Sequence, residues 1–157
     1  MEDKTFSYRN LIVWQKAKLL VRLVYAEVKR LPAEERYALG DQIRRAVVSI
    51  PSNIAEGAGR ASNRDYGHFL SIARGSLYET INQLEIAQDL GYATLTEEIE
   101  TLAAEVGRML TSLMKKYSIH STTTTSNYNQ TNLHSTTTTS NYNQTNLHST
   151  TTTSNYN

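Results

Sequence analysis

Apolar residues recur every three or four positions in four segments of this chain, and no segment of comparable length alternates at every second position. Such spacing places the apolar side chains on one face of an α-helix. The four expected stripes are Val13, Ala17, Leu20, Val24, Val28 and Leu31; Leu39, Ile43, Val47, Ile50 and Ile54; Phe69, Ala73, Leu77, Thr80, Leu84 and Ala87; and Leu95, Ile99, Leu102, Val106, Met109 or Leu110, and Leu113. Because short connections make successive helices antiparallel neighbours, we predict an all-α fold, an antiparallel up-down four-helix bundle. The bundle is expected to cover about residues 8–117, within a domain that spans residues 1–117.

Residues that disfavour or cap helical backbone predict where these helices begin and end. A proline pushes the preceding residue out of the helical region, and a glycine at a helix end adopts a positive φ without penalty. On these grounds the first three helices are expected to end at Pro32, at Gly57 with Gly59, and at Gly91. A hydroxyl three residues before a carboxylate forms a capping box that starts a helix. Two such boxes predict the starts of the third and fourth helices: Ser62 with Asp65, and Thr94 with Glu97.

Pro51 falls inside the second stripe, where it removes the backbone hydrogen bond to the Val47 carbonyl. The stripe nevertheless keeps its phase as far as Ile54. We therefore predict one Pro-kinked helix rather than two helices. The hydroxyls of Ser49 and Ser52 are expected to satisfy the freed carbonyl.

The first helix is apolar over most of its circumference. Two further apolar stripes flank its main one, and only the arc that bears Lys18, Arg22 and Lys29 is expected to be solvated. In a plain four-helix bundle no helix is central, so this pattern predicts that copies of the chain associate as a homo-oligomer. The alternative is a wide contact within the bundle together with an exposed Trp14. The expected interface residues are Ile12, Trp14, Leu19 and Leu23.

The composition changes sharply after Lys116. All 16 Lys and Arg residues and all 15 Asp and Glu residues lie at or before it, and residues 118–157 carry none. This second region is a tandem repeat of 14 residues, STTTTSNYNQTNLH, which fills 121–134 and 135–148 and returns in part at 149–157. It has too few apolar residues to offset the entropy of ordering the chain, so we predict a disordered tail.

A formal net charge of +1 conceals an uneven distribution. Residues 4–74 carry +7, whereas residues 75–114 carry −6. Such asymmetry indicates either an electropositive face that contacts phosphates or attraction between copies of the chain. The candidate nucleic-acid-binding residues are Lys18, Arg22, Arg44, Arg45, Arg60, Arg64 and Arg74. The alternative is a solvated face whose cations pair with carboxylates of a neighbouring subunit.

No residue pattern in the chain indicates catalysis. The absence of Cys excludes disulfides and thiolate chemistry. His68 is the one histidine of the predicted bundle, and its helical neighbours Asp65 and Ser71 do not by themselves make a triad. The turn before Arg60 lacks the Gly-Lys-Ser/Thr ending of a phosphate-binding loop. We therefore expect a protein that is not an enzyme and holds no cofactor or metal.

The polar N-terminus and the lack of an 18-residue apolar run predict a soluble, cytoplasmic protein that does not enter a membrane.

Three segments, in order along the chain, resemble the four helix bundle protein family, also called the 23S rRNA intervening-sequence or S23-like proteins. They are residues 11–17 (LIVWQKA), 39–57 (LGDQIRRAVVSIPSNIAEG) and 69–79 (FLSIARGSLYE). The resemblance covers about residues 8–117 and implies an all-α bundle, usually assembled as a ring-like homopentamer, with no firmly assigned activity. It also implies that the second helix runs through Pro51.

A relative of that family, the accessory variability determinant of diversity-generating retroelements, works with a reverse transcriptase and nucleic acid through a basic surface. The resemblance therefore implies RNA or DNA as a partner, together with a reverse transcriptase or another protein. Arg44, Arg45 and Arg74 fall within the matching segments, whereas the other four candidate cations rest on charge alone. The alternative function is a structural adaptor that binds another protein and uses its basic residues for subunit pairing.

Overall fold

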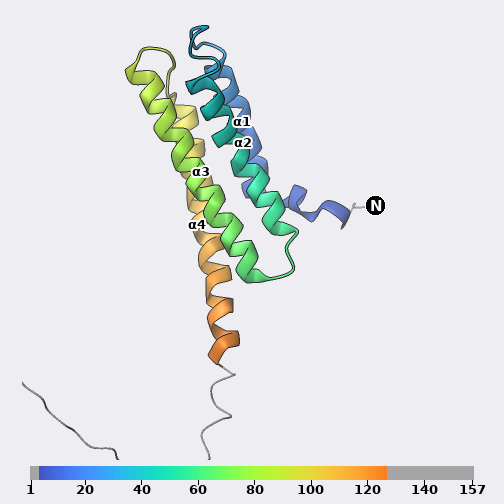
Figure 1. Cartoon of the computed structure of the whole chain (residues 1–157). Coiled ribbons are helices and arrows are strands. Elements are labelled where there is room, and N and C mark those ends of the chain that lie inside the picture. Colours follow the sequence, from blue (N-terminus) through green and yellow to red (C-terminus); the bar gives the residue numbers. More distant parts are fainter. Residues whose placement is uncertain (1–3, 127–157) are drawn as a thin grey trace, which may run out of the picture.

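The computed structural model describes the backbone of residues 4–126 and the side chains of residues 6–117. A short 3-10 helix, η1 (Lys4–Asn10), precedes four α-helices, α1 (Ile12–Val28), α2 (Leu39–Ala58), α3 (Asn63–Asp89) and α4 (Glu97–Ser126) (Figure 1). No strand occurs between residues 4 and 126, and the predicted all-α class with four helices is confirmed. The last helix continues past residue 117, where the bundle was expected to end. Residues 127–157, on which most of the predicted tail falls, lie outside the described residues, so its disorder stays a prediction.

The four helices pack in cyclic order. Helices α1 and α3 each contact both α2 and α4. The α1–α2 and α3–α4 connections lie at one end of the bundle, and the α2–α3 turn lies at the other end (Figure 1). Helix η1 projects sideways from the start of α1 and also contacts α2. In this order one outward-facing surface extends over α1 and α2, and another extends over α3 and α4.

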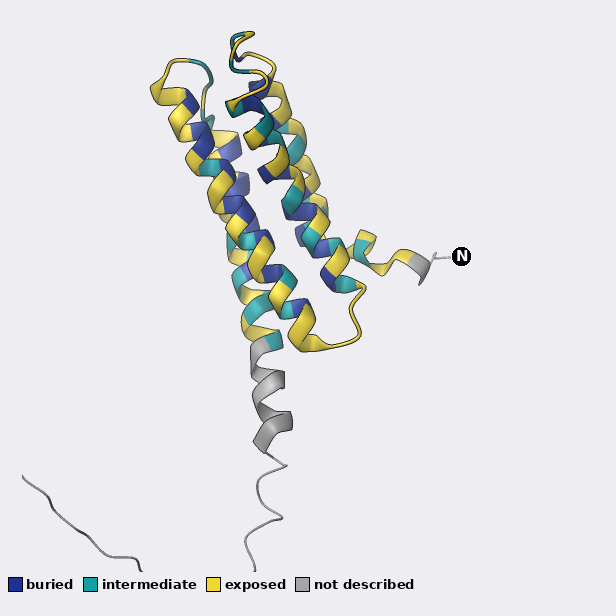
Figure 2. Cartoon of the chain, in the orientation of Figure 1, coloured by how far each residue is buried: buried dark blue, intermediate teal, exposed yellow. Residues whose placement is uncertain are grey.

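The buried core is formed by the predicted stripes. Figure 2 shows the buried residues on the inner sides of the helices, and the fully buried ones include Leu20, Ile43 and Leu84. Phe69, predicted in the core, is only partly buried. It lies at the edge of the face that α3 turns inward, where the guanidinium of Arg60 covers its ring at 4.6 Å.

Two predicted helix boundaries are confirmed at α3. The Asp65 N–H donates to the Ser62 hydroxyl at 3.0 Å, so Ser62 is the N-cap. At the other end Gly91 has a φ of 74°, and the N–H of the next residue, Tyr92, donates to the Ala87 carbonyl at 2.8 Å. This bond across a left-handed glycine is the usual way in which a helix terminates.

The predicted start of α4 was wrong by two residues. The helix begins at Glu97, and the residue before it, Thr96, accepts a hydrogen bond from the Ile99 N–H at 3.3 Å. A cap residue bonds to the N–H two or three positions into the helix, and Thr96 rather than Thr94 has that place.

The predicted role of the glycines at the end of α2 was also wrong. Gly57 lies within the helix, and Gly59 has a φ of −87°, so neither uses a positive φ. Gly57 is needed instead because α3 comes very close: an added Cβ would lie 2.8 Å from Phe69 Cβ and 2.8 Å from Tyr66 Cδ2. Gly57 is therefore required by the close approach of α3 to α2, and not by the end of α2.

Helix α2 runs without a break through Pro51, which is buried. The Ser52 hydroxyl donates to the Val48 carbonyl at 2.8 Å and not, as expected, to the carbonyl of Val47. A serine in a helix reaches the carbonyl four residues before it, which explains the difference. Ser49 instead accepts a hydrogen bond from Ser76 of α3 at 2.9 Å, and the predicted kink stays a prediction.

Candidate nucleic-acid interface

A shallow hollow of about 530 Å³ lies on the outer surface between α1 and α2. Its lining consists of Tyr25 from α1 and Asp41, Arg44, Arg45, Val48, Ser49 and Ser52 from α2. The α2 residues follow one another at spacings of three and four or as direct neighbours, so they share the outer side of the helix, opposite its buried residues. The hollow thus combines an aromatic ring, two guanidinium groups and two hydroxyls.

The two neighbouring arginines of this hollow have different roles. Arg44 Nη2 lies 2.5 Å from Asp41 Oδ1 and also donates to the backbone carbonyl of Arg36. It therefore ties the α1–α2 connection to α2. Arg45 is exposed and contacts no carboxylate within the described residues, so its charge is available to a ligand.

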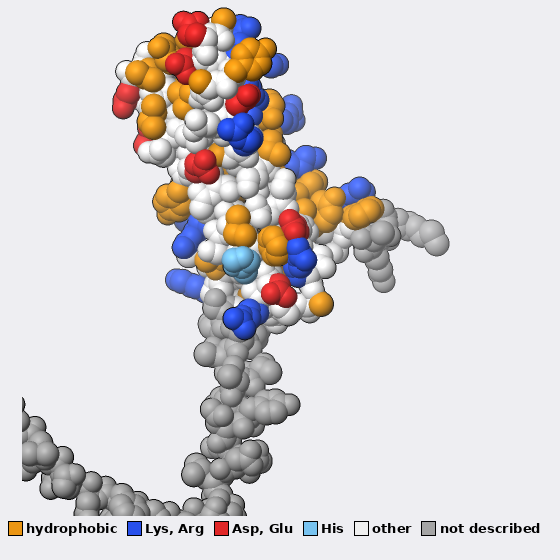
Figure 3. All heavy atoms as spheres, in the orientation of Figure 1, with side chains coloured by type: hydrophobic (Ala, Val, Ile, Leu, Met, Phe, Trp, Pro, Cys, Tyr) orange, Lys and Arg blue, Asp and Glu red, His pale blue; other side chains and the backbone are white. Residues whose placement is uncertain are grey.

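Every carboxylate on α1 and α2 is already engaged by an arginine of the same region. The pairs are Glu27 with Arg30, Asp41 with Arg44, and Glu56 with Arg60. Four cations of this surface contact no carboxylate in the part of the chain that the structure describes: Lys18, Arg22, Lys29 and Arg45. We call these four residues the unpaired cations. Lys and Arg side chains follow the edge of the molecule that α1 and α2 occupy (Figure 3).

Lys18 and Trp14 belong to a row of ring contacts that joins η1 to α1. The Lys18 ammonium lies 4.6 Å from the centre of the Trp14 ring, and the Tyr8 ring packs edge-on against Trp14 at 5.1 Å between centroids. Trp14 is therefore partly covered by its own chain.

The other predicted interface residues differ in exposure. Ile12 is 55% exposed and Leu19 42% exposed, whereas Leu23 packs partly against the core. Part of the predicted interface is thus free on the surface of a single subunit, and association between copies stays a prediction.

The structure separates the remaining candidate cations from this surface. Arg60 pairs with Glu56 at the α2–α3 turn, and Arg64 is exposed in the first turn of α3, at the end of the bundle away from the α1–α2 connection. Arg74 lies on α3, four residues before Tyr78 and seven before Ile81, so it shares the side of the helix from which these two residues line a groove toward α4. The seven predicted cations therefore do not converge on one surface, because helical spacing within each segment does not say which helices lie side by side.

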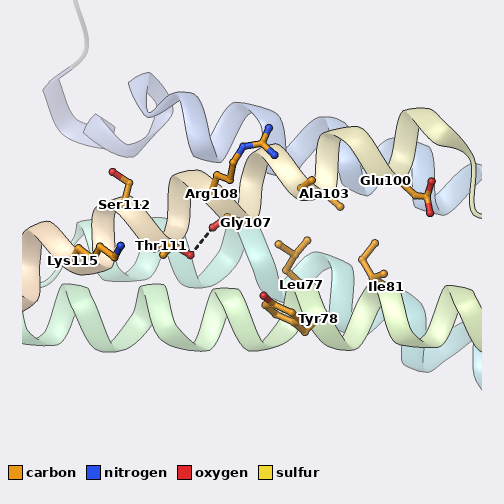
Figure 4. A pocket seen from close by; sticks show the side chains of 11 residues that line it. Leu77, Tyr78, Ile81, Glu100, Ala103, Gly107, Arg108, Thr111, Ser112 and Lys115 are labelled. Carbon is orange, nitrogen blue, oxygen red and sulfur yellow. Dashed lines mark hydrogen bonds between the residues drawn. The ribbon is translucent and has the colours of Figure 1, made fainter.

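A larger groove, of about 670 Å³, runs between α3 and α4 (Figure 4). Leu77 and Ile81 project from α3 toward α4, whereas Arg108 points away from α3. Tyr78 stands at its edge and is 71% exposed. The predicted stripes do not include this groove, although Tyr78 and Ile81 are apolar residues outside the stripe of α3 and could have indicated it.

Tyr66 is a buried titratable residue that lines neither the hollow nor the groove. The Tyr66 hydroxyl has no hydrogen-bond partner among the described residues, and its ring lies 4.6 Å from that of Tyr117. Burial, and to a lesser extent the neighbouring phenol of Tyr117, raises the pKa of Tyr66 above its ordinary value of 10.0. His68 is exposed, with its ring 5.9 Å from that of Phe69.

The described part of the chain holds no group of three His, Cys, Asp or Glu side chains that could bind a metal ion. It also holds no helix with the length and apolar character needed to cross a membrane.

Comparison with known proteins places the bundle in a family. Residues 9–112 match the family described as 23S rRNA-intervening sequence protein, a span that includes α1, α2, α3 and about half of α4. No curated protein matches the chain. The expected relation to the accessory variability determinant stays a prediction. Because the match covers well over half of the chain, this protein belongs to the 23S rRNA-intervening sequence protein family.

Proposed function

We propose that this protein is a non-enzymatic, oligomeric protein that associates with nucleic acid through the surface over α1 and α2. The observation that carries the proposal is that several cations of this surface have no carboxylate partner within the described residues. Each carboxylate of α1 and α2 is paired, while Lys18, Arg22, Lys29 and Arg45 are not.

Cations without carboxylate partners suit phosphate binding. Phosphates that contact Lys or Arg release condensed counterions, which favours association at low salt. The fork of an arginine also matches a phosphate group in two parallel hydrogen bonds. Because the carboxylates on α1 and α2 are already occupied, these two helices offer little negative charge to cancel that attraction.

Association between copies would multiply this effect. Ile12 and Leu19 are seven residues apart on one face of α1, and both are exposed. Burying them against another copy would remove apolar surface from water and would repeat the unpaired cations around the assembly. A nucleic acid long enough to contact several copies would then gain affinity from each.

A salt titration of RNA binding tests the proposal. The Arg22→Gln/Arg45→Gln variant should lower the slope of log K against log salt by about 1.4–1.8, which corresponds to the loss of two phosphate contacts. The control Arg74→Gln/Arg108→Gln makes the same charge change on α3 and α4 and should leave the slope unchanged. Absence of binding at low salt, or equal effects of the two variants, would refute the proposal.

The α3–α4 groove supports a second candidate function, an adaptor that binds another protein. Its lining is largely apolar, and exposed Tyr78 resembles the aromatic residues that dominate protein interfaces. Co-purification of one stoichiometric protein partner, free of nucleic acid and lost in Tyr78→Ser, would favour this candidate. Retention of that partner in Tyr78→Ser would argue against the groove.

A further inference from the structure

We propose that the hollow between α1 and α2 binds an unpaired base of a single-stranded nucleic acid, with Tyr25 as the stacking surface and Arg45 as a phosphate contact. The inference rests on the proposed nucleic-acid association and adds the class of nucleic acid that is bound. It also assigns a role to Tyr25 that charge alone does not suggest.

Tyr25 lies at the centre of the unpaired cations. Arg22 and Lys29 are three residues before it and four residues after it on the same side of α1, and Arg45 shares the hollow with it. Its side chain is 36% exposed, so the ring borders solvent where phosphates would collect. Aromatic rings within a basic groove are the usual means of holding single strands, because every base has a π-face that can stack.

The remaining lining residues add polar and apolar surface to the hollow. The Ser49 hydroxyl accepts hydrogen bonds from Ser76 at 2.9 Å and from Asn53 Nδ2 at 2.9 Å. These two bonds hold Ser49 in place at the border of the hollow toward α3. Val48 adds exposed apolar surface beside Tyr25.

Arg44 holds the hollow in shape rather than binding the ligand. Its contacts with Asp41 and with the Arg36 carbonyl fix one wall before any ligand arrives. A wall that is already ordered avoids part of the entropy cost of binding. The same contacts neutralise much of its charge, which leaves Arg45 as the cation that can meet a phosphate.

A duplex would use this surface less well. In a double helix both faces of each base are covered by neighbouring bases, so Tyr25 could not stack on one, whereas unpaired bases can splay out onto an aromatic ring. The unpaired cations alone would still attract duplex phosphates. The expected signature is therefore weak binding of both forms with a preference for single strands that depends on Tyr25.

The test uses the full chain and two labelled probes of equal length, an oligouridylate and an RNA duplex. Tyr25→Leu keeps an apolar side chain, and it should weaken oligouridylate binding by about 5- to 150-fold while changing duplex binding by less than about twofold. Tyr25→Phe should retain wild-type binding of both probes. Because neither change removes a charge, the salt dependence of binding should keep its slope, unlike that of Arg45→Gln. Tyr78→Leu, on α3, serves as the control and should bind as the wild type does.

The outcomes separate this inference from the proposed function. If neither probe binds, both fail. If both probes bind and Tyr25→Leu affects neither, or affects both equally, the single-strand site is overturned while nucleic-acid association stands. Photocrosslinking of a 4-thiouridine oligonucleotide to the unsubstituted chain gives a test that does not depend on how the variants fold. It should label the tryptic peptide 23–29, and labelling confined to the α2–α3 turn would also overturn the site.

Discussion

Replacing Gly57 by Ala should destabilise the bundle, although the same substitution in an open part of a helix should stabilise it. Ala is favoured over Gly in a helix by about 0.8–1.0 kcal/mol. At Gly57, however, the new Cβ would lie 2.8 Å from Phe69 Cβ and 2.8 Å from Tyr66 Cδ2, so these side chains and the α3 backbone that carries them must move. Overpacking of this kind costs about 1–3 kcal/mol. The expected net loss in the free energy of unfolding is therefore about 0–2 kcal/mol.

Gly75 provides the matched control. It also lies inside a helix, α3, but it is exposed, and an added Cβ there would meet no atom within 4 Å. Gly75→Ala should thus gain the full helix preference, about 1 kcal/mol. The difference between the two variants isolates the cost of the close contact between α2 and α3, about 1–3 kcal/mol.

Urea unfolding followed by circular dichroism measures both variants. The subunit concentration must be the same in all samples, because association would make the midpoint depend on it. If Gly57→Ala proved as stable as Gly75→Ala, α2 and α3 could not approach as closely at this point as the structure indicates, and the explanation of the glycine would be wrong.

Three further predictions concern single residues. Arg44→Gln should lower the free energy of unfolding by about 1 kcal/mol in urea titrations, with little direct effect on RNA affinity. Arg45→Gln should instead weaken RNA binding and leave the free energy of unfolding nearly unchanged. Equal behaviour of the two variants would contradict the roles assigned to these arginines. Because burial raises the pKa of Tyr66, the neutral phenol is favoured in the folded state, so the stability it contributes is complete below pH 10.0 and decreases above it. Tyr66→Phe should therefore lose less stability than the wild type when urea titrations are repeated at higher pH, and an identical loss would contradict the burial of the phenol. Leu19→Glu should reduce the mass measured by light scattering to that of one subunit, and an unchanged oligomer would place the interface elsewhere.

The four helices could be predicted from the sequence because their signal is local. Residues such as Ile43 and Leu84 recur at helical spacing, and each is buried. The caps at Ser62 and Gly91 were predictable for the same reason, since each depends on backbone within a few residues.

The features that depend on distances between helices could not be predicted. Gly57 was interpreted as a helix end because nothing in the sequence shows how closely α3 would approach it. Likewise, the charge of Arg74 was visible in the sequence, but which helix packs beside its side of α3 depends on the order of packing. The pairing of Arg44 with Asp41 could have been suspected from their spacing of three residues on one helix.

The most direct test of the account compares two fourfold variants with the same change in net charge. One replaces the unpaired cations Lys18, Arg22, Lys29 and Arg45 by Gln, and the other replaces Arg64, Arg74, Arg108 and Lys115. Titration of single-stranded RNA against salt, followed by fluorescence anisotropy, gives the slope of log K against log salt for each. We predict that the first variant lowers this slope by about three and loses most of its affinity at low salt, while the second stays close to the wild type. Equal losses in the two variants would contradict the claim that the surface over α1 and α2 binds nucleic acid.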